Sequence, residues 1–293
     1  MLSFKRLMMD DKDMVNKYLA INKFENSEYN FTTMMAWQFV YGCDYAFANE
    51  CLLLRGFSDG KTYFYFPLGY AESVKGALHA LMAHCEAESL PLMLVNVSSG
   101  MLDILEASGM AEMFDKDCRR EAADYVYKRD RLVSLSGKKL HGKKNHLNFF
   151  NNTYESRLEP IDASNIDECE KMLKAEISER STRPHEEMNS TFMALRYRDE
   201  LGLVARALYA NDELAGVIIA EQHHNVALIQ IAKADIGYRG ASVALFQKFL
   251  EDNLQDCEYV NFMEDLGLEG LRRAKLSYDP DHLVDKCLLT LKV

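Results

Sequence analysis

Residues 226–250 read VALIQIAKADIGYRGASVALFQKFL, and residues 258–278 read EYVNFMEDLGLEGLRRAKLSY. The first segment opens with a mostly apolar run of strand length, and Gly237 and Gly240 bracket the turn that follows. From Val243 onward, apolar residues recur at three- and four-residue spacing, which predicts a helix that packs one face on a sheet. The free N–H groups and the dipole at the start of such a helix favour a phosphate or a carboxylate. The two segments therefore predict an α/β unit with an anion site where strand and helix join.

Size and charge limit the class of protein. A chain of 293 residues with 48% hydrophobic residues is long enough for two domains with their own cores. The formal net charge of -11 argues against a double-stranded DNA-binding protein, because such proteins are usually basic over the binding surface. No run approaches the length of a transmembrane helix, and the first residues turn acidic instead of forming a signal peptide. We therefore expect a soluble cytoplasmic protein; the sequence does not indicate its oligomeric state.

The seven cysteines are widely scattered and include no C-x-x-C pair. An odd number at irregular spacing in a cytoplasmic chain predicts buried, reduced thiols.

The order of predicted elements repeats along the chain. The first half has a hairpin around Ser58-Asp59-Gly60, helices at 72–88 and 99–108, and a strand at 92–97. A last strand of this half is expected to include Tyr125, Tyr127, Leu132 and Val133. The second half has helices at 165–178 and 187–200, a hairpin around Asn211-Asp212, and then the two segments quoted above. Val95-Asn96 and Val260-Asn261 occupy corresponding strands, so one α/β unit is used twice; chance agreement of common elements is the alternative.

A cationic run lies between the halves, at residues 135–152. Its members in an otherwise acidic chain are Lys138, Lys139, Lys143, Lys144, Asn145 and His146, with His141 nearby. One interpretation is a solvated linker with a little helix. The other is an anion-binding basic strip, since clustered lysines bind phosphates and the neighbouring Phe149 and Phe150 offer stacking surfaces.

Three segments taken together resemble a known family. They are LSGKKLHGKKNHLNFF at 135–150, KADIGYRGASVALFQKFL at 233–250, and YVNFMEDLGLEGLRRAKLSYDP at 259–280. They resemble bacterial proteins grouped with the C-terminal catalytic domain of phosphatidylglycerol lysyltransferase, over about residues 30–287. The resemblance implies an α/β fold with mixed sheets, made of two tandem GNAT-like acyltransferase domains. It also implies acyl or aminoacyl transfer, with aminoacyl-tRNA as the donor.

We therefore predict a GNAT-like domain at 1–134, a basic linker at 135–157, and a second GNAT-like domain at 158–293 with the active cleft. The first domain is expected to be degenerate, because Pro67 to Tyr70 stand where a phosphate turn belongs. In the second domain, the GNAT turn pattern Arg-x-x-Gly-x-Gly/Ala fits Arg239 and Ala244, but Ser242 replaces the middle glycine. A side chain there hinders the approach of a pyrophosphate to the backbone, which weighs against tight coenzyme A binding.

The candidate catalytic residues are Asn261, in the predicted strand that contains Val260, and Glu264 and Asp265, which follow that strand. Acyl transfer needs a base for the attacking group, and ligands gather at strand ends in open α/β sheets. Alternatively, Glu264 and Asp265 cap the following helix, and Asn261 bonds only to the backbone.

Two further groups complete the predicted site. The donor or phosphate ligands are Arg239, Gly240, Ser242, Arg273 and Lys275; Arg239 offers a bidentate fork, although an exposed turn arginine is the alternative. The substrate-binding candidates are Gln230, Lys233 and Glu221, of which Gln230 equally suits a solvent-facing position.

The spacing of metal ligands is absent from His223-His224 and from His185-Glu186-Glu187, so we predict no metal site. The sequence identifies no firm cofactor. The leading hypothesis is an acyl or aminoacyltransferase that uses aminoacyl-tRNA, contacts the tRNA 3′ end, and modifies an unidentified amine or hydroxyl, such as a small molecule or a lipid headgroup. The alternatives are an acetyl-CoA-dependent N-acetyltransferase and a noncatalytic binding module with the same fold.

Overall fold

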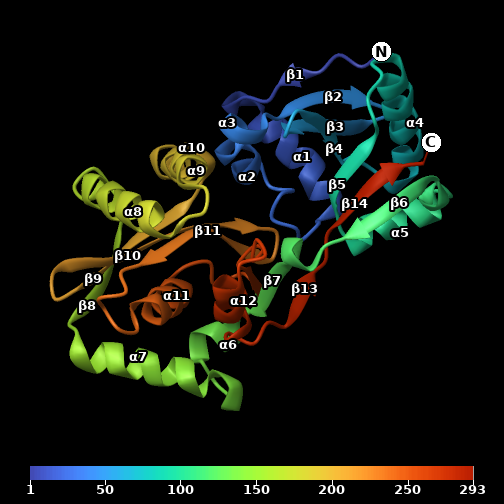
Figure 1. Ribbon diagram of the computed structural model, residues 1–293. Helices are drawn as coiled ribbons and strands as arrows, with labels where there is room; N and C mark the ends of the chain where they lie inside the picture. The colour runs from blue at the N-terminus through green and yellow to red at the C-terminus, as the bar shows by residue number, and fades with distance from the viewer. Residues whose placement is uncertain (293) are drawn as a thin grey trace. The chain divides into compact units, whose positions relative to one another are not determined.

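A computed structural model describes residues 1–292 of the chain, in two compact units, each built on a seven-stranded mixed sheet. The first unit is Met1–Asp124 together with the chain from Val284 onward, and the second is Tyr125–Leu283. The ribbon in Figure 1 identifies the helices and strands of both units. Among the described helices, none is both long and apolar enough to cross a bilayer.

The first unit contains the sheet β1-β2-β3-β4-β5-β14-β6. Its strands are β1 (Lys5–Arg6), β2 (Asp44–Ala48), β3 (Cys51–Ser58), β4 (Lys61–Tyr65), β5 (Met93–Val97), β6 (Phe114–Cys118) and β14 (Cys287–Leu291). Its helices are α1 (Lys12–Asn22), α2 (Phe31–Ala36), α3 (Gln38–Tyr41), α4 (Ala71–Ala87) and α5 (Ser99–Ala107), with short 3₁₀ turns η1 (Met9–Asp11), η2 (Ala111–Met113) and η3 (Arg120–Ala122). Adjacent strands are antiparallel except β4 and β5, which pair in parallel.

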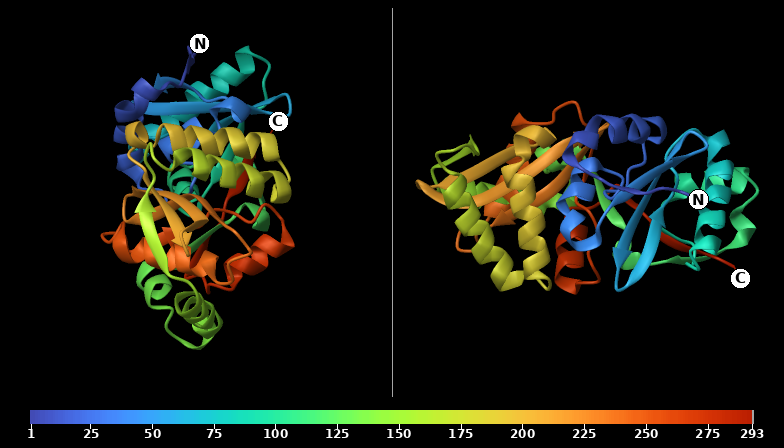
Figure 2. Two further views of the ribbon diagram at one scale, coloured as in Figure 1. Left: turned by 90° about the vertical axis from the view of Figure 1, so that its left-hand side faces the viewer. Right: turned by 90° about the horizontal axis from the view of Figure 1, so that it is seen from above.

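The second unit contains the sheet β13-β7-β12-β11-β10-β9-β8. Its strands are β7 (Asp124–Lys128), β8 (Ser156–Pro160), β9 (Val204–Ala210), β10 (Glu213–His223), β11 (Val226–Ala234), β12 (Tyr259–Asn261) and β13 (His282–Val284). Its helices are α6 (Arg129–Ser134), α7 (His141–Thr153), α8 (Ile166–Arg180), α9 (Pro184–Arg196), α10 (Arg198–Leu201), α11 (Ala241–Asp252) and α12 (Glu269–Leu276), with the 3₁₀ turn η4 (Lys138–Leu140). Helix α11 covers one face of this sheet and helices α8 and α9 cover the other (Figures 1 and 2).

Each sheet is completed by a strand from the other half of the chain. β14, the last strand of the sequence, lies between β5 and β6 in the first sheet, and β7, the last strand of the first half, lies between β13 and β12 in the second. The units therefore differ from the predicted ranges 1–134 and 158–293, because residues 125–134 belong to the second unit and the end of the chain to the first. The predicted linker 135–157 also belongs to the second unit, where it forms η4, α7 and the start of β8.

The core of the second unit shows why its sequence folds in this way. α11 buries its apolar face, including Val243, Phe249 and Leu250, against the sheet residues Ile218 and Ala227. Burial of such side chains stabilises the unit at roughly 25 cal/mol per Å² of apolar surface removed from water. The predicted helix after the turn at Gly240 and the hairpin at Asn211-Asp212 are both present, with Glu213 paired to Ala210.

Two predicted elements are wrong in detail. Leu132 and Val133 do not extend the strand of Tyr125 and Tyr127, because β7 ends at Lys128 and α6 begins at Arg129. Leu132 of this short helix is buried in the core of the second unit. The helix expected at 187–200 is two helices, α9 and α10, which are separated at Tyr197.

The prediction that all seven cysteines are reduced is also wrong. Cys118 and Cys287 lie opposite each other on β6 and β14 and form a disulfide, while the other five cysteines are free and buried. No local pattern indicates this pair, because 169 positions separate the two residues and the place of β14 between β5 and β6 brings them together.

Candidate functional site in the second unit

An opening between two parallel strands sets the position of the candidate site. β11 and β12 pair only at Val226–Leu228 with Tyr259–Asn261, and β12 then ends while β11 continues to Ala234. Among the described residues the ladder between the two strands ends at Leu228 and Asn261, and we call this end of the ladder the opening. Ligands bind at such carboxyl-terminal edges of parallel strands. The predicted residues Gln230 and Lys233 lie on the β11 side of the opening, and Asn261 and Glu264 on the β12 side.

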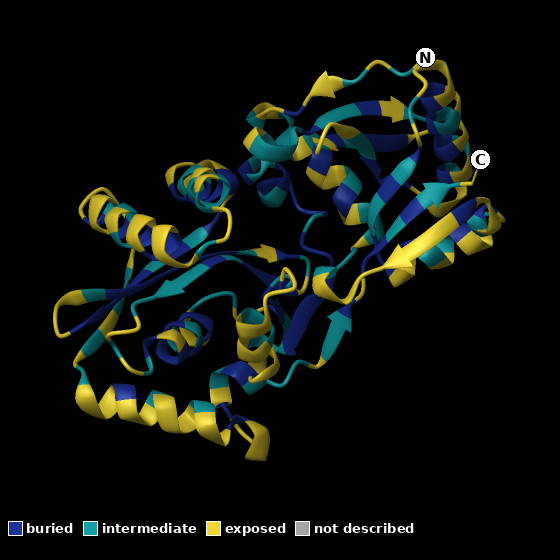
Figure 3. Ribbon diagram, in the orientation of Figure 1, coloured by how far each residue is buried: buried dark blue, intermediate teal, exposed yellow. Residues whose placement is uncertain are grey.

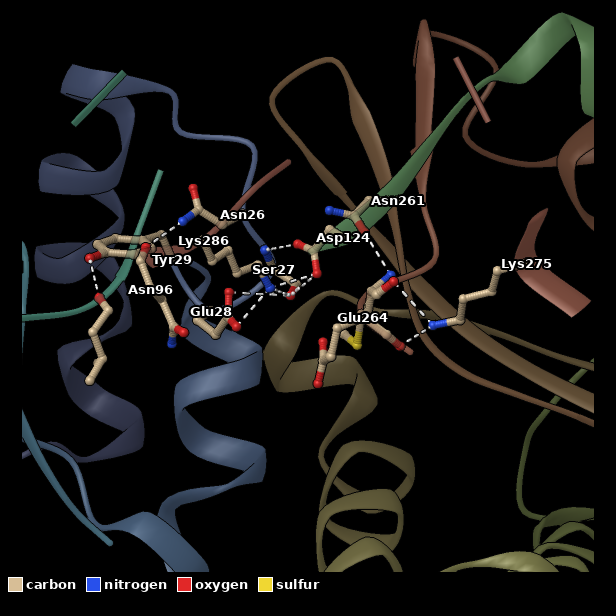
Figure 4. A network of polar contacts seen from close by, with 12 residues as sticks. Asn26, Ser27, Glu28, Tyr29, Asn96, Asp124, Asn261, Glu264, Lys275 and Lys286 are labelled. Carbon is tan, nitrogen blue, oxygen red and sulfur yellow. Dashed lines mark hydrogen bonds and ion pairs between the residues drawn. The ribbon is translucent and has the colours of Figure 1, made fainter. Parts of the chain in front are cut away.

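Two side chains hold the loop that follows β12. Asn261 is fully buried, and its Oδ1 accepts a hydrogen bond from the backbone N–H of Met263 at 2.7 Å. Lys275 Nζ donates to the carbonyl oxygens of Phe262 at 2.6 Å, of Met263 at 3.0 Å, and of Glu264 (Figure 4). The Lys275 ammonium is thus directed at backbone carbonyls, which favours a role in shaping the loop over the predicted role as a phosphate ligand.

Asp265 is the most constrained residue of this loop. Its carboxylate is fully buried and accepts hydrogen bonds from Tyr125 Oη at 2.6 Å, from Arg272 Nε at 2.7 Å and Nη2 at 3.0 Å, and from the Gly267 N–H at 2.9 Å. Burial alone raises the pKa of Asp265, but the hydrogen bonds from Arg272, Tyr125 and Gly267 outweigh it and hold the pKa well below its usual range. A carboxylate so stabilised is a poor proton acceptor, so the geometry favours a positioning role over the predicted catalytic one.

Glu264 differs from its neighbour in exposure. Its side chain is only half-buried, whereas Asp265 is completely enclosed. The backbone carbonyl oxygen of Glu264 accepts a hydrogen bond from Lys275, which holds the chain at this residue. Of the two predicted carboxylate residues, Glu264 is the one that remains partly exposed to solvent.

The three predicted substrate-binding residues take part in two separate interactions. Gln230 Nε2 donates to Glu221 Oε1 at 2.9 Å across the β10–β11 pair. Lys233 Nζ instead forms an ion pair at 2.6 Å with Glu187 Oε1 of α9. The structure therefore brings Gln230 and Glu221 together and adds Glu187, to which the sequence assigned no substrate contact.

Glu176, which interacts electrostatically with Lys233 and Asp235, was not among the predicted site residues. Glu176 on α8 is buried and pairs with Arg180 at 2.9 Å. Burial raises the pKa of Glu176; Arg180 opposes this, and Asp235 adds to it. The sequence signal was a glutamate on the otherwise apolar face of a helix, next to Leu173 and Ile177.

Helix α7 covers the predicted phosphate turn. Gly240, at φ +92°, caps α11, and a Cβ at this position would collide with the backbone carbonyl of His146 and touch Phe150. The exposed Arg239 lies with its guanidinium carbon 4.5 Å from the centre of the Phe149 ring, also on α7. Ser242, on the first turn of α11, is exposed. The backbone at Gly240 therefore packs against protein instead of facing an open phosphate site.

The predicted basic strip does not act as one surface. Figure 3 shows α7 exposed along most of its length; among its residues only Phe150 is buried. Lys139 pairs with Asp279 at 2.8 Å, and the Lys143 Nζ lies 3.8 Å from the centre of the Tyr278 ring. Asn145 contacts the ring of His141.

The remaining two lysines of the strip border an open hollow. It measures about 570 Å³ and is lined by Leu135, Ser136, Gly137, Lys138, His141 and Lys144. Over residues 1–292, neither Lys138 nor Lys144 has an ion-pair partner, so both charges are available to an anion.

The predicted donor ligand Arg273 takes part in an ion pair at the protein surface. It lies exposed on α12 and pairs with Glu269 one turn away at 2.7 Å. Exposed pairs of this kind contribute little stability. As for metals, the part of the chain that the structure describes contains no group of three His, Cys, Asp or Glu side chains able to hold an ion.

Solved structures of similar architecture identify the fold. A conserved protein of unknown function from Bacteroides thetaiotaomicron is 28% identical, with a TM-score of 0.93 over 100% of both chains. L-PGS from Bacillus licheniformis is 12% identical, with a TM-score of 0.67 over 96% of this chain and 92% of the other. A tandem GNAT protein from the clavulanic acid biosynthesis pathway is 12% identical, with a TM-score of 0.53 over 99% of this chain and 98% of the other. The predicted fold class, two tandem GNAT-like domains, is confirmed by these matches and the two mixed sheets.

Sequence comparison points to the same group. An uncharacterised protein of Mycoplasmoides gallisepticum is 25% identical over 190 residues, which span 63% of this chain and 62% of that relative. The model of the family described as phosphatidylglycerol lysyltransferase, C-terminal, matches residues 19–290. Since this match covers nearly the whole sequence, the chain belongs to the family described as phosphatidylglycerol lysyltransferase, C-terminal.

Proposed function

We propose that the protein transfers an aminoacyl group from an aminoacyl-tRNA to an amine or hydroxyl acceptor, at the opening between β11 and β12. The observation that carries the proposal is the Glu264 loop. Its carboxylate is half-buried at the strand opening, while Lys275 and the Asp265–Arg272 pair hold the backbone around it. Such rigid placement of a base is what an acyl transfer site requires.

In the proposed step, Glu264 takes a proton from the attacking amine or hydroxyl. The nucleophile forms a bond to the ester carbonyl carbon of the donor, and the bond from that carbon to the ribose oxygen breaks. The proton then passes to the leaving ribose oxygen, which restores the carboxylate. The aminoacyl moiety would contact Gln230 and Lys233 of β11 and Glu221 of the neighbouring β10.

Charge complementarity supports an RNA-borne donor. Lys138 and Lys144 carry unpaired charges at the hollow beside α7, within the described chain, and phosphate groups are the anions that clustered lysines bind. The packing of α7 against Gly240 weighs against coenzyme A, because a pyrophosphate on the turn would need the space that the His146 carbonyl occupies.

Binding of charged tRNA by the wild type tests the donor. The variant Lys138→Gln/Lys144→Gln should bind more weakly and reduce the slope of log K against log salt by about 1.4 to 1.8, the value for two lost phosphate contacts. The matched control Lys139→Gln/Lys171→Gln removes the same charge, but from a lysine already paired with Asp279 and from one on α8. Absence of tRNA binding by the wild type would refute the donor assignment.

Transfer itself needs a separate measurement. Glu264→Gln should leave tRNA binding unchanged and slow transfer by about 100-fold or more, the usual contribution of a general base. Saturable thermal stabilisation by acetyl-coenzyme A would instead support an N-acetyltransferase. Unchanged activity in Glu264→Gln would remove Glu264 from the mechanism.

A further inference from the structure

The two cysteines of the disulfide in the first unit differ in exposure. Cys118 is the last residue of β6 and is exposed, whereas Cys287 on β14 is 4% exposed. Figure 3 shows that most of β6 is exposed, and among the described strands β6 is the last one at its edge of the sheet. Exposed disulfides exchange with thiols more readily than enclosed ones. One sulfur of this bond is therefore open to a reagent in solution, and the other is not.

The direction of attack also favours the Cys118 sulfur. In thiol–disulfide exchange, a thiolate approaches one sulfur in line with the S–S bond, from the side away from the other sulfur. Cys287 lies opposite Cys118 on β14, so a thiolate that attacks Cys118 comes from beyond the outer edge of the sheet. Attack on Cys287 would have to come from the side on which Val97 of β5 pairs with it. Access thus selects Cys118 as the attacked sulfur.

The five free cysteines are poor competitors for the same reagent. All five are buried. Burial raises the pKa of their thiols, to about 11 for Cys51, Cys85 and Cys257 and to about 12 for Cys43 and Cys169. Because the thiolate is the reactive form, such thiols react slowly. Within residues 1–292, a thiol reagent therefore meets an exposed cysteine at position 118 alone.

The disulfide also closes a small ring within the first unit. One side of the ring is the chain from Cys118 to Asp124. The other side is Lys286, next to Cys287, whose Nζ forms a buried ion pair with Asp124 at 2.6 Å. Lys286 also contacts Glu28 Oε1 at 2.7 Å, which joins the ring to the segment before α2. Opening of the disulfide leaves the ion pair to hold the ring, so the residues between Cys118 and Asp124 gain freedom.

We propose that Cys118 is a modification site for a low-molecular-weight thiol, which opens the Cys118–Cys287 bond reversibly and loosens the residues between Cys118 and Asp124. The thiolate sulfur of the small molecule forms a bond to Cys118 Sγ, and the Cys118–Cys287 bond breaks. Its electron pair leaves on Cys287 Sγ, which takes a proton from water. The sulfur of the small thiol is thereby oxidised and that of Cys287 reduced. In the reverse step, the Cys287 thiolate attacks Cys118 Sγ, restores the bond and expels the small thiol. The proposal does not depend on aminoacyl transfer.

Glutathione added to the native, oxidised protein is the first probe. The reaction is stopped with acid, and mass spectrometry of the peptides locates the attached glutathione. We expect one glutathione on Cys118 together with a free Cys287 thiol, and removal of glutathione should restore the disulfide. Attachment to Cys287 or to any of the five buried cysteines of the folded protein would overturn the proposal.

Two matched serine variants separate the two sulfurs. In Cys287→Ser, Cys118 should form a lasting mixed disulfide with oxidised glutathione, because no partner thiol expels the small molecule. In Cys118→Ser, the buried Cys287 should react at least about 10-fold more slowly. Circular dichroism checks that both variants are folded. Equal rates in the two folded variants, or no reaction of Cys118 in Cys287→Ser, would rule out Cys118 as the site.

Amide hydrogen exchange measures the structural consequence. The peptide between Cys118 and Asp124 should exchange on the order of 10-fold faster in the glutathione-modified wild type than in the oxidised protein. Helix α4 of the same unit is the internal control and should exchange at the same rate in both. Identical exchange of the 118–124 peptide in the two states would show that the bond does not restrain this segment, and would contradict the proposal.

Discussion

Arg272 donates two hydrogen bonds to the buried carboxylate of Asp265, from Nε at 2.7 Å and from Nη2 at 3.0 Å. The planar guanidinium matches both carboxylate oxygens at once, which fixes its orientation as well as its distance. This pair joins the loop after β12 to helix α12 and so holds the backbone that carries Glu264. The candidate site thus depends on an ion pair whose own carboxylate is engaged in hydrogen bonds and is a poor proton acceptor.

Replacing Asp265 by asparagine should lower the free energy of unfolding. Removal of one partner of a buried ion pair costs about 3–5 kcal/mol. We expect the lower end of that range, because the Arg272 side chain is 36% exposed and water screens its charge. Urea unfolding at pH 7 measures the difference. Glu269→Gln, which breaks the exposed pair with Arg273, is the control and should change stability little.

The Asp265–Arg272 pair also predicts that the stability of the fold depends on pH. The folded-state pKa of Asp265 lies below its unfolded value of about 3.9, so the carboxylate stabilises the fold above that pH. This contribution is lost as the pH falls from about 4 toward the folded pKa. The difference between wild type and Asp265→Asn should therefore shrink over that interval; a constant difference would contradict the assignment.

His84 should be replaceable with a gain in stability. It is buried beside the rings of Phe4 and Phe64, and neither ring nitrogen has a hydrogen-bond partner among residues 1–292. His84→Leu removes this unsatisfied polar group and should raise the free energy of unfolding by about 1 kcal/mol at pH 7. Thermal and urea unfolding measure the effect.

The difference in stability between the wild type and His84→Leu should increase at acidic pH. Burial lowers the pKa of His84, with Arg55 adding to the effect and Glu88 opposing it. The unfolded chain therefore binds a proton first as the pH falls below about 6.5, and the wild type loses stability there. The leucine variant should not show this loss, and a parallel decline in both proteins would refute the prediction.

The Cys118–Cys287 bond predicts a thiol count. Alkylation after unfolding without reductant should label the five free cysteines, and prior reduction should make all seven reactive. Reduction should also lower stability by about 2–5 kcal/mol, because the bond closes a long loop of the unfolded chain. Cys118→Ser should abolish the response of stability to reductant. Labelling of seven residues in the untreated protein would show that the bond does not form.

Lys286 provides a test of the first unit. Its buried Nζ contacts Asp124 Oδ1 at 2.6 Å and Glu28 Oε1 at 2.7 Å, as Figure 4 shows. Lys286→Met should lower the free energy of unfolding by roughly 3–5 kcal/mol, since the fully buried Asp124 then lacks its cation. The double variant Lys286→Met/Asp124→Asn should recover part of the loss. A single variant as stable as the wild type would show that the pair is dispensable.

Local patterns were enough to predict much of the second unit. The apolar spacing after Gly240 predicted α11, and the Asn211-Asp212 turn predicted the β9–β10 hairpin. These elements depend on residues that are close in sequence. The spacing of the apolar side chains specifies the helix, and the turn residues specify the hairpin. The same reasoning placed Glu264 and Asp265 in one loop at a strand end. It did not distinguish them, because their difference arises from Tyr125 and Arg272, which reach Asp265 from other elements.

The sequence by itself determined the element order, the repeated α/β pattern and the polar residues at the strand ends. Only the tertiary structure decided that β7 and β14 each complete the sheet of the other half, that Cys118 meets Cys287, and that α7 covers the turn at Gly240. These relationships join segments far apart in the chain, whose contacts depend on the packing of whole sheets and helices. A local pattern carries no information about them, because periodicity specifies which face of an element is buried but not which partner buries it.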